Sequence, residues 1–103
     1  MQQQAIDACH AAVKEQLKSP TSASFEADAP VQVRPGASAG GFDVAGTVDS
    51  QNGFGAVVRN IYLCNALLSQ KPPPPFVALV PVLREGASLP PDFFDDPLGK
   101  KAN

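Results

Sequence analysis

Two cysteines and a single histidine are the side chains of this 103-residue chain best suited to covalent or metal chemistry. Cys9 falls on the apolar stripe of an expected N-terminal helix and Cys64 falls late in an expected strand, so the two thiols could meet. A disulfide there would stabilise the fold by about 4 kcal/mol in the chain-entropy model, if the compartment is oxidising. The alternative is two buried thiols packed as small apolar side chains. The sequence leaves both interpretations open.

A metal site is not expected from these residues. His10 lies about 100° around the helix from Cys9, so the two side chains cannot converge on one ion. A closed zinc site also needs more ligands than Cys9, His10 and Cys64 supply. We therefore expect no metal and no cofactor, and we expect His10 to face solvent.

Hydrolytic and phosphate chemistry lack their usual residue patterns. No serine stands in a Gly-x-Ser-x-Gly elbow. The glycine-rich residues 36–41 are not followed by the Lys-Ser or Lys-Thr pair that grips phosphate. Asp95 and Asp96 lie in an expected mobile tail, which cannot hold two acids at a catalytic separation. The chain is therefore not expected to be an enzyme.

A turn-rich segment at residues 49–55 is the first candidate binding surface. It could present Gln51, Asn52 and Phe54 to a partner from the end of a rigid hairpin. Phe54 could equally fold inward. Arg59 could pair with an aspartate across the sheet, either Asp49 or Asp43, or could offer its guanidinium to an outside carboxylate.

The same segment has a purely structural interpretation. Asp49 and Asn52 could cap their own turn, while Gly53 and Gly55 supply backbone angles that other residues rarely adopt. We prefer this structural role for Asp49, Gly53 and Gly55.

The C-terminal residues are the second candidate surface. Phe93 and Phe94 stand among acids and prolines, a composition typical of a short docking motif that orders on binding. They could instead pack onto this protein's own core or onto a second copy. The preceding residues 71–75 include four consecutive prolines and predict a stiff polyproline spacer.

The elements that position these residues follow from periodicity and from turn formers. Apolar residues at steps of three and four predict a helix over residues 3–18, which Pro20 ends, with Ser19 as the cap of one further turn. Alternating patterns predict strands over residues 31–34 and 42–49. Residues 56–66 fit either a helix or a strand, and their β-branched content favours the strand.

These elements form one α+β domain over residues 1–83, with a core at residues 3–68. We expect the N-terminal helix to pack on a three- to four-stranded antiparallel sheet. One sheet face would be covered by the helix, and the other by residues 76–83 or by a second subunit. Residues 76–83 should form an edge strand, since Pro81 cannot donate to a neighbour. Residues 84–103 are expected to be a flexible or docking tail.

Two stretches resemble a known family. Residues 17–25 (LKSPTSASF) and 44–59 (VAGTVDSQNGFGAVVR), followed by Cys64, are similar to small uncharacterised domains of actinobacterial secreted or lipid-anchored proteins and of actinobacterial phages. The resemblance covers roughly residues 5–64. It implies a helix on an antiparallel sheet, and it implies no known activity and no catalytic residue.

Composition excludes some partners. The formal charge of −2 and the isoelectric point near 5.1 come with no basic stripe for phosphates, so nucleic acid is not an expected partner. No apolar run is long enough to span a membrane. A complete chain without a leader would be cytoplasmic in a host cell, whereas a chain trimmed of its leader would be secreted or part of the cell envelope.

The sequence thus favours a non-catalytic protein-interaction module, most plausibly a phage-encoded accessory protein that binds a host or phage protein. A disulfide-stabilised structural domain of a secreted or envelope protein is the alternative, and a small enzyme ranks third. A homodimer through the sheet edge or the tail is a further possibility.

Overall fold

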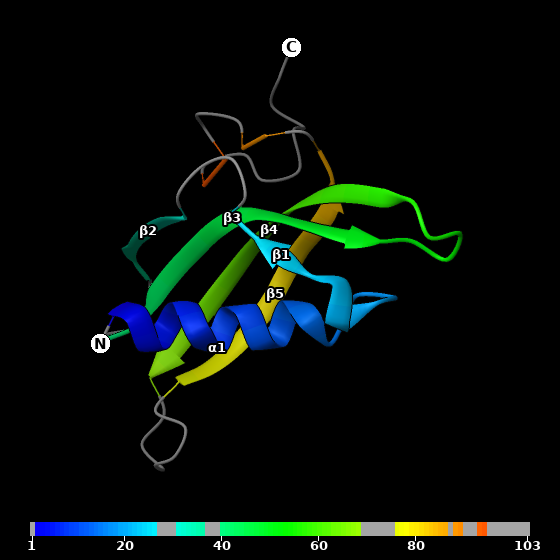
Figure 1. The fold of residues 1–103 in the computed structure, drawn as a ribbon. Coiled ribbons are helices and arrows are strands. Elements are labelled where there is room, and N and C mark those ends of the chain that lie inside the picture. Colours follow the sequence, from blue (N-terminus) through cyan, green and yellow to red (C-terminus); the bar gives the residue numbers. More distant parts are fainter. Residues whose placement is uncertain are drawn as a thin grey trace.

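The computed structural model describes residues 2–26, 31–36, 40–68, 76–86, 88–89 and 93–94. Within these ranges one helix packs on an antiparallel sheet, which confirms the α+β prediction (Figure 1). The elements in chain order are the helix α1 (Gln2–Lys14), the short 3-10 helix η1 (Pro20–Ser22), and the strands β1 (Ser24–Phe25), β2 (Gln32–Pro35), β3 (Phe42–Gln51), β4 (Val57–Leu68) and β5 (Phe76–Glu85). The expected polyproline spacer at residues 71–75 lies outside the described residues.

A long hairpin of β3 and β4 forms the middle of the five-stranded sheet. Its register runs from Phe42 opposite Ala66 to Gln51 opposite Val57. β5 pairs with the other side of β4, while the short strands β1 and β2 both pair with β3. The strand interpretation of residues 56–66 is therefore correct, and the resulting strand is slightly longer than predicted.

α1 ends earlier than its apolar stripe suggested. The helical turns stop at Lys14, and the next residues form tighter turns in which Gln16 and Leu17 donate to the carbonyls three residues back. Leu17 nevertheless packs against the core. η1 begins at Pro20 as expected, but the Ser19 side chain makes no capping hydrogen bond.

The sheet buries apolar residues on both faces. The helix face holds one cluster, which includes Val13, Val44 and Tyr62. The opposite face holds a second cluster, formed by Ala45, Ile61, Leu63, Val82 and Phe93. The apolar residues on both faces of the segment that forms β4 predict that both faces of the sheet are covered. Residues 76–83 are not the cover, because they extend the sheet as β5, and the buried Phe93 lies on that face instead.

Candidate functional site

Cys9 and Cys64 form a disulfide that joins α1 to β4. Their Cα atoms are 5.9 Å apart, within the usual range for a bridged pair. Both residues are fully buried in the cluster between helix and sheet. Of the two arrangements that the sequence left open, the structure contains the covalent one.

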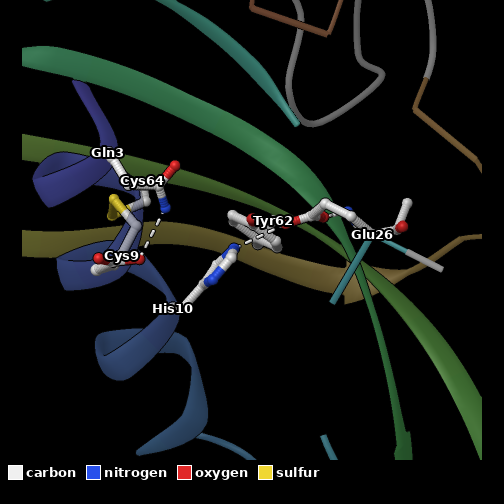
Figure 2. Close-up of polar contacts among 8 residues, drawn as sticks. Gln3, Cys9, His10, Glu26, Tyr62 and Cys64 are labelled. Carbon is white, nitrogen blue, oxygen red and sulfur yellow. Dashed lines mark hydrogen bonds and ion pairs between the residues drawn. A yellow bond between two sulfur atoms is a disulfide. The ribbon is translucent and has the colours of Figure 1, made fainter. Parts of the chain in front are cut away.

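Beside the disulfide, His10, Glu26 and Tyr62 form a connected polar cluster (Figure 2). His10 Nε2 and the Tyr62 hydroxyl both donate to Glu26 Oε1, at 2.7 and 2.9 Å. The Thr47 backbone N–H donates to Glu26 Oε2 at 3.0 Å. Glu26 therefore ties the end of β1 to the helix and to both central strands, and it does so with a backbone φ of 54°.

His10 does not face solvent as expected. Its ring stacks on Phe25, with centroids 4.0 Å apart, and its side chain is 26% exposed. The expectation failed because β1 lies beside the flank of α1 that carries His10. Periodicity identifies the stripe of a helix that faces the sheet, but it does not reveal that another segment covers the neighbouring flank.

The polar groups of this cluster bond one another and are largely shielded from solvent. Burial, and then the nearby Glu26 carboxylate, raises the pKa of Tyr62 above its usual range, so the phenol stays protonated. Every buried side-chain nitrogen and oxygen among the described residues has a hydrogen-bond partner.

The hairpin loop between β3 and β4 is held by Asn52. Its Oδ1 accepts hydrogen bonds from the backbone N–H groups of Phe54 and Ala56, at 2.8 and 3.1 Å. Gly55 has a φ of +84°, which favours glycine. Gly53 does not adopt a positive φ, so the special backbone role expected for it is wrong.

Asp49 pairs across the sheet and does not cap the turn. Arg59 lies directly opposite it and donates from Nε and Nη2 to the two Asp49 oxygens, at 2.6 and 2.8 Å. Hydrogen bonding from the guanidinium lowers the pKa of Asp49 below its usual range. Of the alternatives for Arg59, the structure contains the cross-strand pair with Asp49, while Asp43 bonds Arg34 and Asn65.

The other candidate binding residues separate into two groups. Phe54 stands at the hairpin tip with 98% of its surface exposed. Gln51 and Asn52 line a hollow of about 300 Å³, whose other walls come from the segment after α1 and from β4 and β5.

Phe93, by contrast, is 1% exposed within the second cluster. Phe94 is half-buried, with the Arg34 guanidinium 4.4 Å from its ring centroid. Phe93 and Phe94 therefore pack on this protein's own fold, one of the alternatives that the sequence left open. The expected tail also begins later than residue 84, because β5 extends to Glu85.

Two further classes of feature are not found within the described part of the chain. No group of His, Cys, Asp and Glu side chains gathers there in a way that could hold a metal ion. None of its helices has the length and apolar character required to cross a membrane. Comparisons with protein-family models, with curated proteins and with solved structures find no match to this chain.

Proposed function

We propose that this protein is a non-catalytic interaction module that contacts a protein partner through the tip of its β3–β4 hairpin. The observation that carries the proposal is the exposure of Phe54, which is 98% accessible at the tip of the longest strand pair. Large aromatic side chains contribute a disproportionate share of binding energy at protein interfaces. An aromatic ring presented in this way has little role in stabilising the fold.

The hairpin that presents Phe54 is braced on both sides of the tip. Asn52 fixes the loop through its two backbone hydrogen bonds, and the Arg59–Asp49 pair joins the strands below it. A loop that is ordered before binding loses less conformational entropy when it binds. The amide side chain of Gln51 and the hollow beside it offer polar contacts next to the tip of the same hairpin.

The disulfide supports an oxidising compartment as the place of action, since cytosolic thiols are normally kept reduced. This also favours a second candidate function, a structural domain of a secreted or envelope protein with no partner at the hairpin. The resemblance of residues 44–59 to actinobacterial and phage proteins supports a partner from a phage or its host.

A photocrosslinking experiment separates the two candidates. A photoreactive phenylalanine analogue replaces Phe54 in one variant and Gln4, an exposed residue in the first turns of α1, in the control. The N-terminal end of α1 and the β3–β4 loop lie at opposite ends of the molecule (Figure 1). Both proteins are irradiated in envelope and cytosolic extracts of an actinobacterial host. We expect one defined protein to be captured from position 54 and not from position 4.

Competition makes the result specific. Unlabelled wild-type protein should abolish the crosslink, whereas the Phe54→Ser variant should not, although its stability is unchanged because the removed ring is exposed. Equal capture from positions 54 and 4, or equal competition by the Phe54→Ser variant, contradicts the interaction proposal and leaves the structural domain as the better account.

A further inference from the structure

The first half of β5, at its outer edge, lacks the usual protection against pairing with another strand. Residues 76–83 contain no charged side chain. Within the described ranges β5 pairs with β4 alone, so its other edge has no strand partner there. Natural edge strands are normally shielded by charges, bulges or prolines. β5 carries such features only after Leu79: a register shift opposite Leu63 and Asn65, then Pro81, and then the charged Arg84 and Glu85.

The proline divides this edge into unequal parts. Pro81 has no N–H and interrupts pairing at its position, which leaves Phe76–Val80 as a continuous stretch able to form a ladder. Val77 and Leu79 in this stretch are 51% and 53% exposed. Because side chains alternate along a strand, these two apolar side chains lie on the same face of β5, next to its open edge.

We propose that the β5 edges of two copies of this chain pair antiparallel about a two-fold axis, and so join the two sheets into one. The axis passes through Ala78, the centre of Phe76–Val80. Val77 of each copy then lies opposite Leu79 of the other, so the two exposed apolar side chains cover one another. The stretch contains no charge, so the symmetric arrangement brings no like charges together.

The helix above this edge presents small side chains toward it. α1 contacts β5 most extensively, and its His10 flank faces β1 on the far side of the sheet. At about 100° per residue, Ala8 and Ala12 lie on the opposite flank, toward the β5 edge. Two α1 helices brought side by side in the dimer would therefore meet through small side chains. This contact does not involve the hairpin tip.

Sedimentation of the full chain tests the proposal. Wild type should be a dimer at high micromolar concentration, and Leu79→Lys, which places a charge at the edge, should shift it to monomer. The matched control is Val57→Lys, because Val57 is 71% exposed but lies at the hairpin end of β4. This control and Phe54→Ser should both remain dimeric. A monomeric wild type, as expected if another protein's strand occupies the edge, overturns the proposal.

Cysteine crosslinking tests the register itself. Directly opposed residues of an antiparallel pair have Cβ atoms about 5 Å apart, whereas diagonal neighbours are about 7–8 Å apart. A mixture of Val77→Cys and Leu79→Cys proteins should therefore form mixed disulfide dimers several times faster than either protein alone. The native cysteines are buried and bonded to each other, so they do not compete. Equal rates in all three samples, or a dimer that survives Leu79→Lys, contradict the proposed pairing.

Discussion

Gly46 lies directly opposite Tyr62 in the β3–β4 pair, and the space left by its missing side chain is where Tyr62 meets Glu26. A Cβ atom at position 46 would lie 2.7 Å from the Tyr62 hydroxyl, and it would also collide with the Glu26 carboxylate. The glycine is therefore required by the polar cluster and not by a backbone angle. It links a position in the middle of β3 to the contact between helix and sheet.

Gly46→Ala should destabilise the protein by about 1–3 kcal/mol, because a well-packed site must shift to accept the methyl group. Urea unfolding followed by circular dichroism measures this change. The matched control is Gly53→Ala, since a Cβ there meets nothing within 4 Å. The control should be neutral or slightly stabilising, by at most about 1 kcal/mol. Equal effects at the two positions would show that the cluster does not depend on Gly46.

Tyr62 should resist ionisation until the protein unfolds in alkali. Its pKa in the folded state is raised by burial and by Glu26, whereas a tyrosine in an unfolded chain titrates at about pH 10. The group's contribution to stability is therefore complete below about pH 10 and declines as the pH rises further. Tyr62 is the only tyrosine and the chain has no tryptophan, so absorbance at the tyrosinate band reports on it alone.

We expect tyrosinate absorbance to rise together with the loss of circular dichroism as the pH increases. In the urea-unfolded chain, titrated in parallel, Tyr62 should ionise gradually around pH ~10. A gradual titration near that pH in a protein that keeps its circular dichroism would contradict the burial of the phenol.

Reduction of Cys9–Cys64 should cost about 4 kcal/mol of unfolding free energy in the chain-entropy model, given the separation of 55 residues. This is a large part of the roughly 5–15 kcal/mol that holds a typical domain together. Urea midpoints with and without a reductant measure the difference. The variant with both cysteines changed to alanine should be insensitive to the reductant. An unchanged midpoint in wild type would show that the disulfide contributes nothing to stability.

The Asp49–Arg59 pair should contribute a small stability that is lost in acid. The pKa of Asp49 is lower in the folded state than its ordinary value of about 4. The pair therefore stabilises the protein fully above about pH 4, and this stability is lost as the pH falls through the folded-state pKa of Asp49. The two side chains are 20% and 23% exposed, so solvent screening limits the effect to about 1 kcal/mol or less. Carbon NMR of the carboxyl group should show the Asp49 pKa returning toward its ordinary value in Arg59→Gln. A pKa that does not move in this variant would exclude Arg59 as the cause.

Local pattern predicted most of the architecture, and contacts between distant segments explain most of the failures. The apolar stripe of α1 and the alternation in β3 are decided by residues close in sequence, so periodicity found them. The positions of His10 and Phe93 are decided by segments far along the chain. Glu26 was not identified at all, because its role depends on a positive φ and on three partners from different elements.

The candidate site was likewise predictable only where local sequence decides the structure. The exposure of Phe54 was one of two open alternatives, because a phenylalanine in a turn carries no signal that separates a binding residue from a core residue. For Asp49 we preferred a role in the turn beside it, whereas the structure contains its cross-strand pair with Arg59, which was one of the alternatives left open for Arg59. Which residues face each other across a strand pair depends on the register. The register of a hairpin depends on the length of its loop, which the sequence alone did not define.

The covalent link between α1 and β4 also determines how the molecule responds to proteolysis. The Cys9–Cys64 bond spans the hairpin loop, where residues 53–57 are all exposed. A single cut in that loop would leave an N-terminal fragment carrying Cys9 and a C-terminal fragment carrying Cys64. The two fragments would migrate as one species on a non-reducing gel and separate only after reduction. The exposed tip could thus be cleaved without releasing either half of the sheet.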